Sequence, residues 1–579
     1  MICWRDMPLV AQPSFRNGRR SIFAFLFAAL FAGDALLAAE TPKLVEILAT
    51  ELDRNFQTLK EKGDPKPYFA AYAVTDNEIV SMEATSGLLA AKDTRHSRNL
   101  DVTIRVGSPK LDNYRRQPRD IAQFTLGSAV SLDDNANALK RRLWLDTDSV
   151  YRSASQRLTN IKSDTQMKVD AVDQSDDFSK APASIEFRTT PEFKVNEKQW
   201  AERLRTWSRR LSGAQEILNS AVSFQAQREV KTFVNSEGTR LQHGRTFARI
   251  LIMARAKAYD GMDLATSDTI EAEEPGRLPD PKVVEARIDK VIADLRGLLK
   301  APEVDPFVGP AILSGRASGV FFHEIFGHRI EGHRQKDESE GQTFTKRVNK
   351  EVLPEFLSVY FDPTLKNYAN EDLYGWYDYD DEGVKARRVS VVEQGILKTF
   401  LLSRSPIAGF PESNGHGRRQ AGAEIVARQS NLVVDSAKKV PTAELRQMLI
   451  AEIKRQSKPY GLYFESVTGG YTTTRSQGLQ AFTVIPLVVY RIYPDGRPDE
   501  LVRGADIVGT PLASFAKILA TSDKLEVFNG YCGAESGSVP VSASSPALLV
   551  SEIEVQRKNR SQERPPLLPR PSNPLGGVE

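Results

Sequence analysis

The chain has 579 residues, of which 40% are hydrophobic, 26% are charged and 8% are aromatic, and its formal net charge at pH 7 is +3. Because this length exceeds what one ordinary core serves, we expect about two or three domains. The near-balance of charge excludes the broad basic field that nucleic-acid binding requires, so no nucleic-acid partner is expected.

The first 39 residues have the pattern of an export signal. Arg19 and Arg20 precede an apolar run from Ile22 to Ala32, and small residues follow up to Ala39. We interpret residues 1–39 as a signal peptide cleaved near Ala39, with the bacterial periplasm as the destination. The arginine pair also fits a twin-arginine signal. An uncleaved anchor and an unstructured cytoplasmic extension are the alternatives; no stable membrane span is expected after leader removal.

Residues 40–299 are predicted to form a mixed α/β domain, because apolar residues recur with helical spacing in some segments and alternate with polar ones in others. A polar insertion near 109–200, helical in part, is expected to present a solvated charged face. The predicted helices cover 41–62, 139–173, 200–218 and 281–299, and the predicted strands cover 68–74, 79–84, 100–106 and much of 222–259.

Residues 300–556 are predicted to form a strand-rich, antiparallel domain. Pro302 and Pro306 break the preceding helix, which makes 300–310 the expected boundary. The proline-rich residues 557–579 are expected to be disordered. The fold class is therefore predicted to be α+β. The predicted strands of this half cover 389–392, 397–402, 432–434, 482–491 and 548–555, with one helix over 442–457.

Three of the six histidines of the chain fall between residues 323 and 333, and two of them form a His-Glu-x-x-x-His (HExxxH) element from His323 to His328. Imidazoles are common zinc ligands, and a glutamate directly after the first histidine, here Glu324, is where zinc hydrolases keep their general base. On a regular helix, residues five apart point about 140° apart. A shared metal therefore requires a π-type bulge or a backbone that relaxes around Gly327. A core helix with hydrogen-bonded histidines explains the same residues without a metal.

Several stretches of the second half occur in the same order in a known family. They are SGVFFHEIFGHRIEG from residue 318, the acidic turn 380–383, EQGILK from 393, NGHGRR from 414 and YCGAESGSVPV from 531. On these stretches the second half resembles the TldD/PmbA zinc metalloproteases, specifically their metal-binding, TldD-like branch. NSEG at 235–238 is a fainter match in the first half.

The resemblance implies one Zn²⁺ per chain, held by His323, His328 and Cys532, with Glu324 as general base toward a zinc-activated water. Three protein ligands leave a position open, as in catalytic zinc sites. Cys532 is the only cysteine beyond the leader, and glycines flank it, so we expect a loop to carry it to the metal. A buried apolar thiol is the alternative.

The resemblance also implies partners. Family substrates are unfolded or flexible peptides taken in extended form into a closed cavity. Members work as dimers, so we expect a homodimer or a heterodimer with a PmbA-like subunit. The better-known members are cytoplasmic, which is the alternative to export for this chain.

Three further residues of the NGHGRR stretch are candidates for substrate contact. His416 would contact the peptide, and Arg418 and Arg419 would bind a carboxylate; a solvated basic loop is the alternative. His333 lies ten residues after His323 and is expected to be an orienting neighbour rather than a ligand.

The predicted activity is zinc-dependent hydrolysis of peptide bonds. A His-Glu-x-x-Gly-His element also occurs in dipeptidyl peptidase III, but the acidic second-helix motif expected there is not visible in this sequence. The remaining alternative is a non-catalytic peptide-binding or assembly subunit in which a structural metal joins two segments.

Overall fold

The computed structural model describes residues 40–117, 127–165, 173–476 and 482–558, together with Pro566 and Leu568. The described residues from Thr41 onward form one compact unit. The signal-peptide prediction for 1–39, and nearly all of the tail prediction for 557–579, lie outside the described residues.

The first half builds an eight-stranded sheet in the order β3-β2-β1-β6-β7-β5, with β4 beside β2 and β8 beside β7. Long antiparallel hairpins form most of it. Its strands are β1 (Pro67–Thr85), β2 (Leu88–Ser108), β3 (Leu111–Asp112), β4 (Ser128–Ala129), β5 (Ile185–Phe187), β6 (Asn219–Asn235), β7 (Arg240–Lys257) and β8 (Asp263–Ala272).

The prediction of two separate strands at 68–74 and 79–84 is wrong, because β1 runs through both. The intervening Asp76 and Asn77 stay in register with Arg98 and Ser97 of β2. Asp76 is buried, and Arg98 lies 2.7 Å from one of its carboxylate oxygens. This ion pair makes a charged residue tolerable in the middle of a continuous strand.

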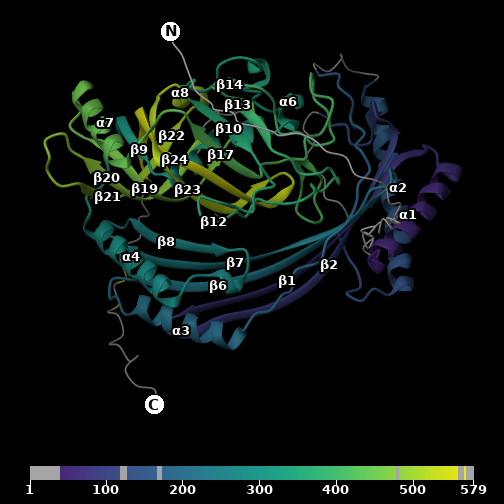
Figure 1. The fold of residues 1–579 in the computed structure, drawn as a ribbon, viewed down its shortest axis with the longest axis horizontal. Helices are drawn as coiled ribbons and strands as arrows, with labels where there is room; N and C mark the ends of the chain where they lie inside the picture. Colours follow the sequence, from purple (N-terminus) through teal and green to yellow (C-terminus); the bar gives the residue numbers. More distant parts are fainter. Residues whose placement is uncertain are drawn as a thin grey trace, which may run out of the picture. The chain divides into compact units, whose positions relative to one another are not determined.

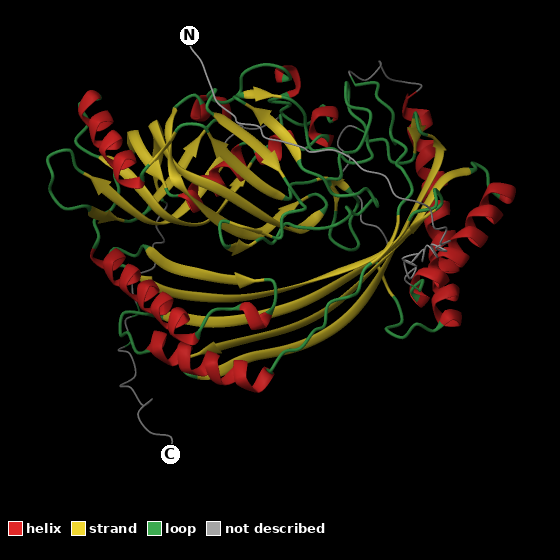
Figure 2. Ribbon diagram, in the orientation of Figure 1, coloured by secondary structure: helices red, strands yellow, loops and turns green. Residues whose placement is uncertain are grey.

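Four helices cover one face of this sheet (Figures 1 and 2). Side chains at alternate positions of a strand share a face, so Tyr72 and Met82 of β1 both point toward the helices. Tyr72 packs in the cluster under α1 and α2, and Met82 packs in the cluster under α3 and α4. The four helices are α1 (Lys43–Lys62), α2 (Ala136–Thr165), α3 (Glu197–Ser212) and α4 (Pro281–Lys300).

The second half builds a twelve-stranded, mainly antiparallel sheet whose principal order is β14-β13-β10-β17-β24-β22-β20-β19-β9. The strands of this sheet are β9 (Phe307–Leu313), β10 (Leu357–Phe361), β13 (Val389–Glu393), β14 (Ile396–Leu397), β17 (Asn431–Ser436), β18 (Lys439–Val440), β19 (Gly461–Thr472), β20 (Phe482–Ile492), β21 (Glu500–Val502), β22 (Ala505–Gly509), β23 (Ile518–Ala534) and β24 (Gly537–Arg557).

Shorter elements complete this half. The paired strands are β11 (Asn367–Tyr368) with β12 (Glu371–Asp372) and β15 (Gly417–Arg418) with β16 (Val426–Ala427). The helices are α5 (Gly315–Ile325), α6 (His333–Lys336), α7 (Thr442–Arg455) and α8 (Pro511–Phe515), and the 3-10 turns are η1 (Pro275–Arg277, at the end of the first half), η2 (Gly327–Ile330) and η3 (Thr345–Arg347).

Helix α5 forms much of the core of the second half. Phe321 and Phe322 are almost completely buried and pack against Phe515, and Phe321 also packs against Phe482. The predicted strand over 397–402 is wrong beyond Leu397. The segment turns away there, because the amide of Leu401 donates to the carbonyl of Ile330 and its carbonyl accepts from Gly332.

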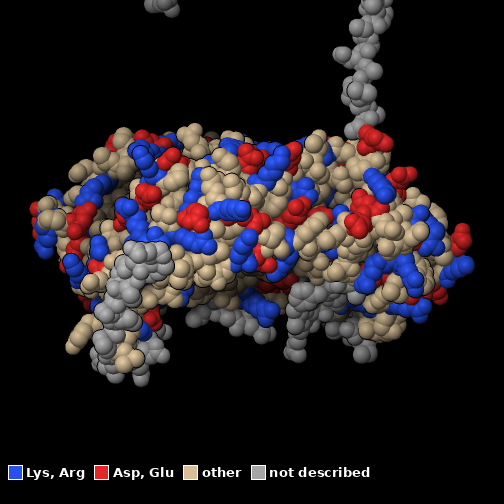
Figure 3. Space-filling model, turned by 90° about the horizontal axis from the view of Figure 1, so that it is seen from below, with Lys and Arg blue, Asp and Glu red and all other residues tan. Residues whose placement is uncertain are grey.

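The predicted α+β class is confirmed: helices gather on one face of the first sheet, and antiparallel strands dominate the second half. The boundary at residue 300 stays a prediction. None of the helices in the described part of the chain has the length and apolar character needed to cross a bilayer. Basic and acidic side chains are interspersed over the face shown in Figure 3.

Candidate metal centre

The histidine motif lies where helix α5 ends. The Ser314 side chain caps the start of α5 by accepting from the amide of Ala317, and the helix runs to Ile325. Residues Gly327–Ile330 then form a tighter 3-10 turn that carries His328. His323 and His328 therefore do not share one regular helix, which removes the angular conflict of their spacing. The π-bulge alternative is wrong, and relaxation of the backbone at Gly327 is confirmed.

Gly327 is required by a close approach of Gln429. A Cβ atom at Gly327 would lie 1.9 Å from Oε1 of Gln429, whose side chain is fully buried. Nε2 of Gln429 donates to the carbonyl of His323 at 3.3 Å. Because Gly327 has no side chain, the buried side-chain amide of Gln429 can approach the end of α5 and hydrogen-bond to the carbonyl of His323.

The structure brings His323, His328 and Cys532 together, with ligand atoms that all lie within 4.8 Å of one another. Sγ of Cys532 lies 3.4 Å from Nε2 of His328, and the two imidazole rings are 5.1 Å apart at 82°. Zinc bonds of about 2.0–2.3 Å at a tetrahedral angle place a nitrogen and a sulfur ligand about 3.6 Å apart. The three side chains therefore fit a shared zinc ion and leave one position open.

The expectation that a loop carries Cys532 is wrong. Cys532 lies in β23, two residues before its end, and pairs with Val539 across the β23–β24 hairpin. Flanking glycines suggested a turn, but both remain in the ladder, opposite Val541 and Ser538. A strand holds the sulfur more rigidly than a loop would.

The charges around the cluster favour metal binding over a buried apolar thiol. Burial alone would raise the pKa of Cys532, but the charges of His328 and Arg428 lower it well below its usual value. Burial alone would lower the pKa of His328, but Cys532 and Glu331 raise it well above its usual value. The pair thus resembles a thiolate beside an imidazolium, and metal binding would displace the proton.

Glu324 lies beside this cluster. One of its carboxylate oxygens is 4.0 Å from Nε2 of His328, and burial raises its pKa above the usual value. The backbone of β19 passes next to it, because a Cβ atom at Gly470 would lie 2.7 Å from Cγ of Glu324.

A buried network of charges surrounds the cluster and was not predicted from the sequence. Glu331, which is completely buried, lies 3.4 Å from Nδ1 of His328 and accepts from Nε of Arg334 at 2.9 Å. Arg428 donates to the carbonyl of Cys532 and lies 3.4 Å from Glu331. The surrounding sequence, GHRIEGHRQKDESE from residue 327, is rich in charged residues and does not single out Glu331 or Arg334.

His333 pairs with Glu535, which also accepts from Arg334. His333 lines the same cavity as the cluster but is not part of it.

The three NGHGRR candidates are buried rather than solvated, so the basic-loop alternative is wrong. His416 is hydrogen-bonded to Ser430, and burial lowers its pKa to about 3. Arg418 donates to the carbonyl of Gln429, and Arg419 lies 3.5 Å from Asp101. None of them lines the cavities at His323 among the described residues. Their role in substrate binding stays a prediction.

Two cavities meet at His323 and Glu324. One, of about 450 Å³, is lined by the cluster, by α6 and by the end of β19. The other, of about 610 Å³, lies between α5 and the first sheet, and Arg249, Leu251 and Ser267 of the first half form part of its wall. An extended polypeptide segment lying next to Glu324 would therefore have space on both sides.

The second half of the chain is similar to known metallopeptidases. Residues 308–557 match the family described as PmbA/TldA metallopeptidase C-terminal domain. A metalloprotease of Methanocaldococcus jannaschii is 29% identical over 247 residues, which are 42% of this chain and 50% of that protein. A zinc metalloprotease TldD homolog of Saccharolobus solfataricus is 29% identical over 269 residues, 46% of this chain and 54% of that protein. The matched region spans about half the length of these relatives.

Solved structures show the same fold over most of the chain. A protein from Thermotoga maritima described as a modulator of a DNA gyrase has a TM-score of 0.59 at 15% identity and covers 88% of this chain and 99% of its own. TldE from Thermococcus kodakarensis has a TM-score of 0.58 at 14% identity and covers 86% and 99%. At these identities the likeness concerns the fold alone.

Proposed function

The chain belongs to the TldD/PmbA family, and from this premise we propose that it is a zinc-dependent metallopeptidase of the TldD type that hydrolyses peptide bonds in unfolded or flexible peptides. The observation that carries the proposal is the convergence of His323, His328 and Cys532 beside Glu324, where two cavities meet.

The residues present suit a single zinc ion. His323, His328 and Cys532 would hold this ion, which would supply a Lewis acid that lowers the pKa of water and polarises a carbonyl group. Glu324 accepts the proton of the attacking water and returns it to the leaving nitrogen. Since burial raises the pKa of Glu324, its carboxylate is a stronger proton acceptor than an exposed one. Glu324 must be ionised to act, so activity should fall as the pH drops through the pKa that Glu324 has in the zinc-loaded protein.

The shape of the site supports an extended substrate. The cavities lie on either side of Glu324, and no strand in the described residues pairs with the side of β19 that faces α5 beyond Phe464. An unfolded segment fits such a cleft, whereas a folded domain cannot bring its backbone to buried ligands.

Assembly and location belong to the proposal as well. A homodimer or a pairing with a PmbA-like subunit is proposed from the resemblance to the TldD/PmbA family, and the molar mass in solution tests it. Export to the periplasm rests on residues 1–39 alone.

The experiment that tests the proposal replaces Glu324 by Gln. The variant should keep one zinc per chain and its fold, while hydrolysis of an unstructured peptide falls by at least about 100-fold. Cys532→Ser provides the comparison, because it should lose zinc as well as activity. Zinc content is measured by metal analysis and cleavage by mass spectrometry of the products. Unchanged hydrolysis by Glu324→Gln would contradict the role of Glu324 as general base, whereas absence of hydrolysis by the wild-type protein would favour a non-catalytic assembly role.

A further inference from the structure

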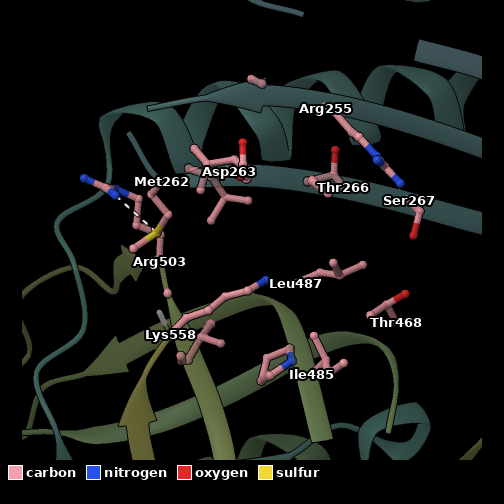
Figure 4. A pocket seen from close by; sticks show the side chains of 18 of the residues that line it. Arg255, Met262, Asp263, Thr266, Ser267, Thr468, Ile485, Leu487, Arg503 and Lys558 are labelled. Carbon is pink, nitrogen blue, oxygen red and sulfur yellow. Dashed lines mark hydrogen bonds between the residues drawn. The ribbon is translucent and has the colours of Figure 1, made fainter. Parts of the chain in front are cut away.

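A third cavity, of about 530 Å³, adjoins the 610 Å³ cavity and is not lined by the metal cluster (Figure 4). It lies between β8 of the first sheet and β20 of the second, and it shares Ser267 and Thr468 with the 610 Å³ cavity beside Glu324. Thr468 stands two residues before Gly470, whose backbone touches Glu324. At about 3.3 Å per residue, the mouth of this third cavity is roughly 7 Å along β19 from Glu324.

The walls of this third cavity are apolar, while its rim carries excess positive charge. Met262, Leu264, Leu298, Ile485, Leu487 and Val502 supply most of the apolar surface.

Two charged groups of the cavity are already neutralised. Arg503 donates to Asp260 at 2.9 Å, and Asp263 lies 2.8 Å from Lys257. Arg255 and Lys558 are different, because neither has a carboxylate within ion-pair distance among the described residues.

These two cations lie at the cavity itself. Figure 4 shows the amine of Lys558 extending toward Leu487 and the guanidinium of Arg255 directed toward Ser267. Both side chains are exposed, so an approaching anion does not have to displace a buried partner. The cavity therefore combines apolar walls with two cations that form no direct ion pair among the described residues, although the charge of Lys558 acts on the carboxyl group of Asp506.

We propose that this cavity binds a carboxylate of the peptide substrate, about three to five residues from the scissile bond. This inference rests on the proposed peptidase function. A carboxylate from the chain terminus and one from an acidic side chain offer the same chemistry to Arg255 and Lys558. The apolar walls accept the aliphatic part of the same residue or of its neighbour.

The test measures peptide affinity in the full-length, zinc-loaded Glu324→Gln protein, where binding is observed without cleavage. Fluorescent, unstructured twelve-residue peptides are compared in two arms. One arm compares a free terminal carboxyl with its amide, and the other moves a single glutamate, with glutamine as its control, along an otherwise neutral amidated peptide. Wild-type cleavage of the neutral amidated peptide is followed in parallel and identifies the scissile bond.

The carboxylate-bearing peptide should bind roughly three- to tenfold more tightly at low salt, and the preference should shrink in 0.5 M salt. Arg255→Gln combined with Lys558→Gln should abolish the preference. Arg557→Gln is the matched control: Arg557 precedes Lys558 on the chain, pairs with Asp305 and does not line the cavity, so the preference should remain.

Equal affinity for charged and neutral peptides would overturn the inference, and so would a preference that survives the double substitution. Failure of the wild-type protein to cleave the neutral peptide would instead contradict the proposed peptidase function, and the affinity comparison would still decide the role of the cavity.

Discussion

Glu331 links His328, a candidate metal ligand, to the charged side chains of Arg334 and Arg428. It is completely buried, yet it contacts His328, Arg334 and Arg428. Burial alone would raise its pKa, but the charges of His328 and Arg334 outweigh burial and lower it to about 2. A carboxylate that stays ionised in this position fixes the imidazole orientation through Nδ1 and leaves Nε2 for the metal.

Replacing Glu331 by Gln should weaken zinc affinity by roughly 10- to 100-fold, measured by competition with a chelator. In the zinc-free protein, the folded-state pKa of Glu331 lies below its unfolded value. Its ionised form therefore stabilises the fold above about pH 4.5, and this contribution is lost as the pH falls toward 2. The stability difference between wild type and variant should thus be larger at pH 7 than at pH 3.

Glu340→Gln is the control for zinc affinity. Glu340 also pairs with Arg334, at 3.0 Å, but its carboxylate forms no ion pair with His328 among the described residues. Zinc affinity in Glu331→Gln that equals the wild type would contradict the orienting role.

The sequence predicted the residues of the cluster better than it predicted their supports. His323, Glu324, His328 and Cys532 were identifiable because few residue types perform this chemistry and the family-like stretches contain them. Glu331 was not identifiable, because its importance depends on which charges lie near it in three dimensions. The buried positions of Arg418 and Arg419 were missed for the same reason.

At the scale of elements, the junction of α5 with the 3-10 turn sets the geometry of the two histidines. Every residue of α5 except Arg316 is buried, and the chain changes from an α-helix to a 3-10 turn just after Ile325. Gln429 packs against the backbone at this point and holds the carbonyl of His323. The junction therefore depends on the shape of a segment that is about 100 residues later in the sequence.

Gly327→Ala should destabilise the fold by about 1–3 kcal/mol, because the new methyl group overlaps the buried Gln429 side chain. Adding Gln429→Ala should recover part of the loss, which a double-mutant cycle of chemical unfolding measures. Gly276→Ala is a suitable control, since the nearest atom to its Cβ lies 3.9 Å away. Additive effects of the two substitutions would argue against the packing explanation.

Most long elements followed from local pattern, and the errors have a common cause. Helices at 41–62, 281–299 and 442–457 appear within a few residues of their predicted bounds as α1, α4 and α7. The split of β1, the strand beyond Leu397 and the loop at Cys532 were wrong because contacts with other segments of the chain decide them. The partners are Arg98 in β2, Ile330 in the 3-10 turn and Val539 in β24. Periodicity does not contain this information.

At the scale of the whole described unit, the first sheet forms one wall of the cleft and is fastened to the second half by side chains of β6 and β7. Arg245 donates to the carbonyls of Tyr374 and Trp376, both at 3.1 Å, and pairs with Glu229. Phe247 stacks on Tyr374, and Lys231 lies 2.6 Å from Asp381. The three candidate zinc ligands all come from the second half, whereas the walls of the 610 Å³ cavity come from both halves.

Arg245→Met should lower stability by about 3 kcal/mol, because it removes both carbonyl contacts and leaves Glu229 with a weaker partner, Lys231 at 3.9 Å. Zinc affinity should be unchanged, while the KM for peptides should rise because the first sheet is held less firmly against the second half. Arg188→Met is the control: Arg188 also joins the halves, through Asp378, but this pair is partly exposed and contributes at most about 1 kcal/mol. Loss of zinc in Arg245→Met would refute the separation of the two roles.

The wide separation of the ligands along the chain has a consequence for biosynthesis. Cys532 is translated 204 residues after His328, and its strand becomes fixed only when β24 forms the hairpin. A nascent chain that ends before this hairpin offers only two imidazoles, too few to retain zinc firmly. If the proposed function holds, catalytic competence would therefore arise only late in synthesis.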